Sequence, residues 1–146
     1  HPFKGNLKLE DLRFTCGHVC GNSTSHSCAV VRLADNYLSG NIPCFESPAL
    51  MSVRLGRNHL SGTIRRLCTD CPKLQHIQLQ GNELRGRAPD LNYPLLEYAE
   101  LSSNFFTGPL PSTASAVKLR TLLLGDNLFS VKLALYRVCL NSLCFG

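Results

Sequence analysis

The sequence predicts an α/β-type solenoid, an arc with a short parallel sheet of about five to six strands on its concave face. Loops and 3₁₀ turns are expected over most of the convex face. Two observations predict this fold. Leucine accounts for 26 of the 146 residues. Asparagine recurs at spacings of 22, 24, 22 and 23 residues, at Asn36, Asn58, Asn82, Asn104 and Asn127. Self-similarity at such a period is the signature of units that stack on their neighbours.

Columns of apolar residues repeat in register with these asparagines. Three residues before each asparagine stand Leu33, Leu55, Leu79, Leu101 and Leu124. Five before stand Val31, Val53, Ile77, Ala99 and Leu122, and two after stand Leu38, Leu60, Leu84, Phe106 and Phe129. Four after stand Gly40, Gly62, Gly86 and Gly108, and six after stand Ile42, Ile64, Ala88, Leu110 and Leu133. Each copy is therefore expected to form one structural unit of a continuous core.

The residues of one copy predict its local structure in order. The segment Ile77-Gln78-Leu79-Gln80 alternates apolar and polar residues, as a short strand with one buried face does. The glycine that stands four residues after the first four asparagines allows a backbone conformation that a side chain would forbid, and only Val131 breaks this column. Prolines at positions 43, 89 and 111 keep the segment after the glycine from continuing as a helix.

The end of the copy resembles a known motif. Leu38-Ser39-Gly40-Asn41-Ile42-Pro43 reproduces the ending L-S-G-x-I-P in full, and residues 60–64 follow it until Arg65 replaces the proline. Residues 106–111 are a conservative version of this ending and residues 84–89 a looser one. With the preceding leucines they resemble the leucine-rich repeat family, in its extracellular plant-type form. A degenerate copy at 9–21 has Gly17 in the asparagine position. The resemblance implies an asparagine ladder, in which each amide pairs with backbone groups of adjacent turns, as a buried polar group must.

The chain is expected to form a single leucine-rich repeat domain. Residues 1–28 would be an irregular, cysteine-rich first repeat, residues 29–135 the regular repeats, and residues 136–146 a cysteine-containing C-terminal segment. No stretch between the repeats has the composition of a linker. No apolar run approaches the roughly 18 to 20 residues of a membrane-spanning helix, so no span is expected in this chain.

The cysteines and one glycosylation motif indicate a secreted or cell-surface protein. Eight cysteines suit an oxidising compartment, and Asn22-Ser23-Thr24 is an acceptor for N-glycosylation. The expected disulfides are local: Cys68 with Cys71, Cys139 with Cys144, Cys16 with Cys20 or Cys28, and Cys44 with whichever of these remains. A zinc site is the alternative for Cys16, His18, Cys20, His26 and Cys28, but their spacings fit no usual finger arrangement. No metal or other cofactor is therefore expected.

Several function classes are disfavoured. No nucleophile elbow, phosphate-binding glycine loop or zinc-protease motif occurs, so we expect no enzyme and no catalytic residues. The net charge is +5, but the only local basic cluster, Arg54, Arg57, Arg65 and Arg66, has no aromatic residue interleaved with it. Binding of nucleic acid is therefore not expected.

The family resemblance implies recognition on the concave strand face. A protein or glycan ligand is expected there, and the residues that the repeat places on that face are Arg32, Arg54, His59, Gln78, Tyr98, Glu100 and Phe105. Arginine and aromatic residues are enriched at interface hot spots. The position two before the asparagine holds Ala34, Gly56, Gln80, Ser102 and Gly125, and the small residues of this column are expected to leave the floor of this face open.

The alternative function is structural. The last residues, around Leu143 and Phe145, are still apolar where a monomeric solenoid needs a polar cap. Contacts between the ends of successive copies would then build a fibre or surface layer.

Overall fold

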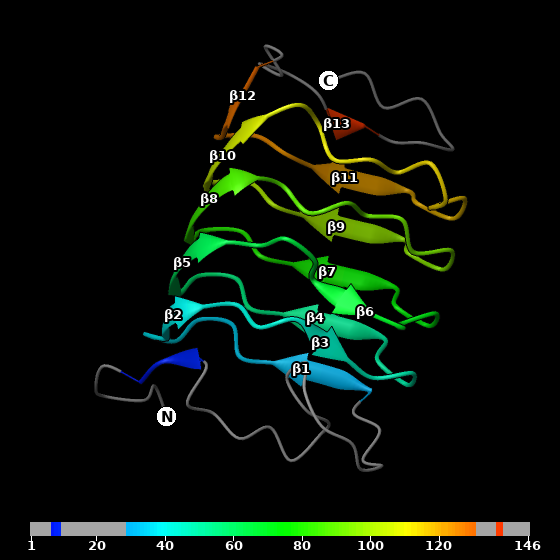
Figure 1. Cartoon of the computed structure of the whole chain (residues 1–146), viewed down its shortest axis with the longest axis horizontal. Coiled ribbons are helices and arrows are strands. Elements are labelled where there is room, and N and C mark those ends of the chain that lie inside the picture. Colours follow the sequence, from blue (N-terminus) through cyan, green and yellow to red (C-terminus); the bar gives the residue numbers. More distant parts are fainter. Residues whose placement is uncertain (1–6, 10–28, 131–136, 139–146) are drawn as a thin grey trace.

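The computed structural model describes residues 7–9, 29–130 and 137–138, and within them the chain forms a β-solenoid of about five turns (Figure 1). One strand per turn enters a six-stranded sheet of order β1-β4-β7-β9-β11-β13. Its strands are β1 (Val30–Arg32), β4 (Ser52–Arg54), β7 (His76–Gln78), β9 (Tyr98–Glu100), β11 (Thr121–Leu123) and β13 (Arg137–Val138). All neighbours pair in parallel except β13, which is antiparallel to β11.

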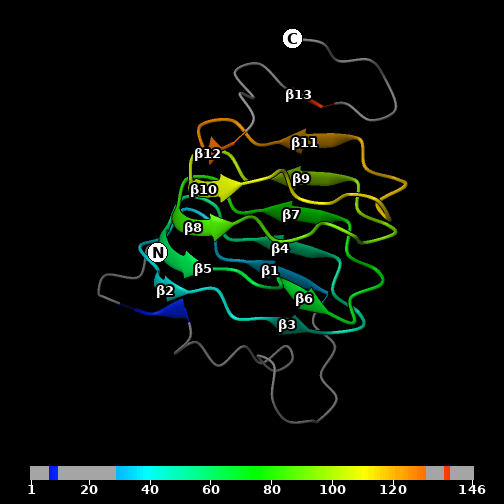
Figure 2. The same cartoon turned by 45° about the horizontal axis from the view of Figure 1, so that its top comes forward.

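A second parallel sheet runs along the stack in the order β12-β10-β8-β5-β2. Its strands are β2 (Ser39–Asn41), β5 (His59–Thr63), β8 (Glu83–Arg87), β10 (Phe105–Gly108) and β12 (Leu128–Phe129). A short pair, β3 (Phe45–Glu46) with β6 (Cys68–Thr69), forms a third sheet. Figure 2 shows the turns stacked with the two large sheets side by side.

The second parallel sheet was not predicted from the sequence, which indicated one sheet only. Residues that follow each asparagine stay extended and hydrogen-bond to the same segment of the next turn, with Gly40 opposite Leu60 and Gly62 opposite Leu84. A repeat of 22 to 24 residues that makes two strands has little chain left for a helix. The described residues therefore contain almost no helix, and the α/β label does not apply to them.

The apolar columns fill the space between the sheets. The central residue of each of the five parallel strands in the six-stranded sheet is buried, from Val31 through Ile77 to Leu122. The leucines three before the asparagines are buried from Leu55 onward. Leu110 departs from its column: its side chain is 38% exposed, whereas Ile42 and Ile64 at the equivalent position are 6% and 4% exposed. The stacked repeat thus builds one continuous core, as the periodicity predicts.

The recurring asparagines occupy the corner between the two large sheets. The Nδ2 of Asn82 donates to the carbonyl of Leu79 in its own turn at 3.0 Å and to that of Leu55 in the previous turn at 3.1 Å. Its Oδ1 accepts from the backbone N–H of Leu60 at 3.0 Å. The same pattern joins successive turns at Asn58, Asn104 and Asn127, whereas the amide of Asn36 bonds within its own turn.

Two residues of each repeat have a left-handed backbone conformation. The four recurrent glycines have φ between 75° and 84°, as their column predicts. The residue just before each asparagine also has positive φ, a feature that the sequence analysis missed; these residues are Asp35, Arg57, Gly81, Ser103 and Asp126. Asp35, Gly81 and Asp126 are residue types that tolerate this region, whereas Arg57 and Ser103 are not among those favoured there. The stack therefore turns at two fixed points per repeat.

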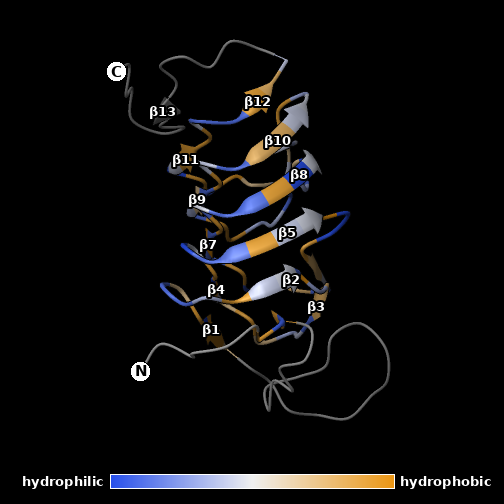
Figure 3. Ribbon diagram, turned by 90° about the vertical axis from the view of Figure 1, so that its left-hand side faces the viewer, coloured by the Kyte–Doolittle hydropathy of each residue, from blue (hydrophilic) through white to orange (hydrophobic). Residues whose placement is uncertain are grey.

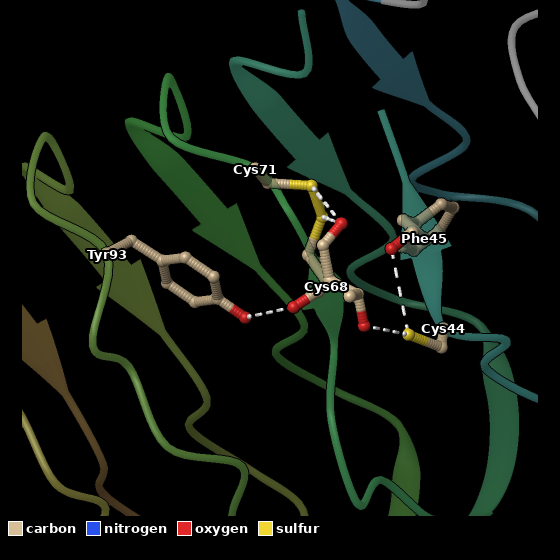
Figure 4. The surroundings of a disulfide bond; sticks show 6 residues. Cys44, Phe45, Cys68, Cys71 and Tyr93 are labelled. Carbon is tan, nitrogen blue, oxygen red and sulfur yellow. Dashed lines mark hydrogen bonds between the residues drawn. A yellow bond between two sulfur atoms is a disulfide. The ribbon is translucent and has the colours of Figure 1, made fainter. Parts of the chain in front are cut away.

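The predicted Cys68–Cys71 disulfide is confirmed, and Figure 4 shows its surroundings beside the β3–β6 pair. The hydroxyl of Tyr93, one turn later, donates to the carbonyl of Cys68 at 3.4 Å. Burial raises the pKa of Tyr93, and this hydrogen bond partly offsets the shift. The Sγ of Cys44 lies 3.3 Å from the Oγ1 of Thr69. The other cysteines, Cys16, Cys20, Cys28, Cys139 and Cys144, lie outside the described residues, as does Asn22.

Candidate functional site

Four polar residues form a row across the six-stranded sheet. The ladder pairs Arg32 with Arg54, Arg54 with Gln78, and Gln78 with Glu100. Neighbouring strands are about 4.8 Å apart, so the row extends over about 14 Å. Its charge changes from cationic on β1 and β4 to anionic on β9. Arg32 is exposed and the other three are half-buried.

A second row runs parallel to the first, two residues earlier in each strand. His76 is paired with Tyr98 in the ladder, and their ring centroids lie 6.5 Å apart. The hydroxyl of Tyr98 donates to the Oε2 of Glu100 at 2.7 Å, which joins the second row to the first. The Nε of Arg54 donates to the Oγ of Ser52 at 3.3 Å in the same way. These contacts restrict the orientation of both charged groups.

The floor of this face is partly closed. Gly56 and Gln80 occupy the position two before the asparagine, and the Gln80 side chain lies over Gly56, where it takes the space that a Cβ would need. The Oε1 of Gln80 is buried and accepts no hydrogen bond from the described residues. The expectation of an open floor was wrong at this point because the long glutamine covers the glycine of the previous turn.

His59 and Phe105 lie apart from the other five predicted binding residues, at the starts of β5 and β10 in the five-stranded sheet. The His59 ring stacks on Tyr37 with centroids 6.2 Å apart, and its Nδ1 is 3.6 Å from the Oε1 of Glu83. The guanidinium of Arg85 lies 4.9 Å from the centroid of the Phe105 ring. The structure therefore divides the predicted site between two sheets.

Comparison with known proteins supplies close matches to this repeat. No protein-family model matches the chain. It is similar to Receptor-like protein 43 from Arabidopsis thaliana, with 29% identity over 117 residues that cover 74% of this chain and 16% of the relative. It is also similar to Receptor-like protein 53 from the same plant, with 27% identity over 132 residues that cover 73% of this chain and 14% of the relative.

A chain in the crystal structure of the BIR3–SERK2 complex from Arabidopsis thaliana has a similar fold. The TM-score is 0.59 and the identity 28%, and the match covers 77% of this chain and 63% of the other. In sequence and in fold the chain resembles plant-type leucine-rich repeat proteins. It spans less than a fifth of the length of the two curated relatives.

The four arginines that cluster in the sequence lie on different elements of the structure. Arg54 lies on the six-stranded sheet, Arg57 is in a turn where its Nη1 contacts the Oδ1 of Asp35 at 3.1 Å, and Arg65 and Arg66 follow β5. No single basic surface results from these four residues.

Metal and membrane sites were also considered. Over residues 7–9, 29–130 and 137–138, no three histidine, cysteine or acidic side chains come together as metal ligands would. The candidates for a zinc site at 16–28 lie outside these ranges, as do Leu143 and Phe145 of the self-assembly alternative. In the same part of the chain no helix has the length and apolarity needed to span a bilayer.

Proposed function

We propose that this chain is a non-enzymatic extracellular recognition module that binds a protein through the outer face of the six-stranded sheet. The observation that carries the proposal is the row Arg32, Arg54, Gln78 and Glu100, held in register on neighbouring strands. Strands fix the spacing of such a row, so a partner meets a preorganised surface. The module would act outside the cell, secreted or as part of a cell-surface protein, as the similarity to receptor-like proteins suggests.

The chemistry of the row defines a complementary partner. Arg32 and Arg54 suit acidic groups, because guanidinium forms strong paired hydrogen bonds with carboxylate. Glu100, whose carboxylate is oriented by Tyr98, suits a basic group or an N–H donor of the partner. That group would lie about 14 Å, or three strand spacings, from the partner group that binds Arg32. Tyr98 and the arginines are residue types that carry binding energy at protein interfaces. A protein is preferred to a glycan because the similar solved chain comes from a complex of two proteins.

The test uses the two chains of that complex as purified probes. The 146-residue chain, with its disulfides intact, is immobilised, and binding of BIR3 and of SERK2 is measured by biolayer interferometry. We expect one of them to bind. The double change Arg32→Glu and Arg54→Glu should weaken that binding at least about tenfold, because each reversal replaces a charge-assisted hydrogen bond with repulsion.

A matched control separates this face from net charge. Arg66→Glu with Arg120→Glu changes the charge by the same amount at exposed positions away from the row, and it should leave binding within about twofold. Thermal unfolding of both double variants should match that of the unchanged chain. The proposal fails if neither probe binds, or if the control pair weakens binding as much as the reversals in the row.

A further inference from the structure

A groove of about 500 Å³ lies past the last residues of three strands in the five-stranded sheet, β5, β8 and β10. It is distinct from the row on the six-stranded sheet and does not depend on the function proposed for that row. Successive turns contribute to its wall, with Arg65 from one, Arg87 and Asp90 from the next, and Leu110 from the third. Its volume falls in the range of about 300 to 1,000 Å³ that is typical of ligand pockets. Figure 3 shows the ends of the three strands side by side.

Two residues of this wall break the pattern of the repeat. Arg65 stands where the other copies have Pro43, Pro89 and Pro111. Leu110 is 38% exposed, whereas Ile64, at the equivalent position two turns earlier, is 4% exposed. The other copies show that the repeat forms with a proline at the position of Arg65 and with a buried side chain at the position of Leu110. Neither departure is required by the packing of the repeat, and both face the same groove.

The charge of the groove favours an anionic occupant. Arg65 and Arg87 are both exposed, and within the described part of the chain neither has an ion pair. Asp90 is the one acidic residue of the wall, and its Oδ1 already accepts the backbone N–H of Ser112 at 3.2 Å. Two guanidinium groups on adjacent turns present planar donor pairs that match carboxylates.

The apolar part of the wall indicates that the occupant also carries aliphatic groups. Ile64, Ala88, Pro109 and Leu110 line the groove beside the arginines. A small inorganic anion would leave this surface in contact with water, whereas a peptide with alternating acidic and aliphatic side chains covers both parts. An extended peptide also offers backbone N–H groups to the carboxylate of Asp90. We propose that the groove binds an extended peptide segment that carries carboxylate and aliphatic side chains, held by Arg65, Arg87 and Leu110.

The experiment measures binding of a fluorescein-labelled peptide of alternating leucine and aspartate by fluorescence anisotropy. The probe is added to the full 146-residue chain under non-reducing conditions. A second peptide, with asparagine in place of aspartate, reports what the carboxylates contribute. We expect the acidic peptide to bind at least about tenfold more tightly than the amide peptide, because the charge-assisted hydrogen bonds are lost in the latter.

Variants test the two parts of the wall separately. Arg65→Gln and Arg87→Gln should each weaken binding of the acidic peptide about tenfold. Leu110→Asn should weaken both peptides by a similar factor, because it removes the aliphatic contact and not the charge. Arg66→Gln is the matched control: it removes the same charge one residue from Arg65 but outside the groove, and it should leave affinity within about twofold.

Four results would overturn the proposal. These are equal affinity for the acidic and amide peptides, an effect of Arg66→Gln as large as that of Arg65→Gln, no effect of Leu110→Asn, or full displacement of the peptide by an equal charge of dextran sulfate. The last result would assign the site to any polyanion rather than to a peptide. The charge reversals at Arg32 and Arg54 serve as an independent check, since they should weaken binding at the six-stranded sheet at least about tenfold and leave peptide affinity unchanged.

Discussion

The two large sheets have the same interior but different exteriors. Each sheet turns apolar side chains inward, as with the buried Ile77 at the centre of β7 and the buried Leu84 near the start of β8. On the outer face of β7, β9 and β11 the flanking side chains are half-buried, whereas on β8 the residues Glu83, Arg85 and Arg87 are exposed. Figure 3 shows a hydrophobic segment of β8 between hydrophilic ones.

This difference indicates which exterior is suited to specific recognition. Side chains that shelter one another, such as Tyr98 and Glu100, lose less conformational freedom when a partner binds. Exposed pairs such as His59 with Glu83 are hydrated and screened, and they contribute little to stability or orientation. The five-stranded sheet therefore supports solubility over most of its surface, and its proposed binding site lies in the groove past its strand ends.

The largest effect on stability is expected from removing a buried side chain on the inner face of the five-stranded sheet. Phe106 is fully buried and its ring is 6.4 Å from that of Phe129, whereas the adjacent Phe105 is 42% exposed beside Arg85. Phe106→Ala should lower the free energy of unfolding by about 3 to 5 kcal/mol, because it leaves a cavity. Phe105→Ala should lower it by less than about 1 kcal/mol. Urea denaturation followed by circular dichroism measures both, and equal losses would contradict the register of β10.

The next effect concerns the corner that joins the two sheets. Asn82→Ala should lower the free energy of unfolding by about 1 to 3 kcal/mol, because the carbonyl of Leu55 and the N–H of Leu60 lose a buried partner. Asn92 is the control. It is exposed, and its side chain bonds to Ser112 and Ser115 of the next turn. Water can replace those bonds, so Asn92→Ala should change the free energy of unfolding by no more than about 0.5 kcal/mol. Equal shifts in melting temperature would mean that the asparagine frame is misassigned.

The sequence predicted the first sheet, the core and the corner glycines because each follows from a column of residue types. The second sheet was missed for a physical reason. The segment Leu84-Arg85-Gly86 contains a glycine and charged residues, which are poor signals of a strand, and it is extended because the next turn supplies its hydrogen-bond partners. Pairing between turns overrides the local preference. The burial of Leu110 was also overestimated, because its column alone cannot show that the groove opens there.

The candidate site was predictable in part for the same reason. Strand periodicity placed Arg32, Arg54, Gln78 and Glu100 at equivalent positions, and their ladder partners follow from the repeat. The coverage of Gly56 by Gln80 could not be predicted, because it depends on the rotamer of a long side chain. Arg65 offered a usable signal, since it replaces a recurring proline.

A smaller effect is expected at Gly62, the left-handed glycine of β5. Gly62 has φ of 80°, and a Cβ there would also meet the Oδ1 of Asn41. Gly62→Ala should lower the free energy of unfolding by about 1 to 2 kcal/mol, because a side chain is strained in the left-handed region. A Cβ at Gly125 would meet no other atom within 4 Å, and the φ of Gly125 is not positive. Gly125→Ala should therefore leave the free energy of unfolding unchanged or raise it by up to about 1 kcal/mol. Gly62→Ala should lower the melting temperature, whereas Gly125→Ala should leave it unchanged or raise it. A lower melting temperature for Gly125→Ala alone would contradict the left-handed conformation of Gly62.

The smallest effect compares the two exteriors directly. Tyr98→Phe removes the hydroxyl that donates to the half-buried Glu100 at 2.7 Å, and it should lower the free energy of unfolding by about 0.5 to 1.5 kcal/mol. His59→Gln removes an exposed contact of 3.6 Å with Glu83, and it should change the free energy by no more than about 0.5 kcal/mol. Both are measured by urea denaturation at low and at high salt. Salt should reduce only the His59 effect, because water and ions reach that pair freely. If the two variants lose equal stability with equal salt dependence, the six-stranded face is no more ordered than the other, and preorganisation cannot explain why recognition would use it.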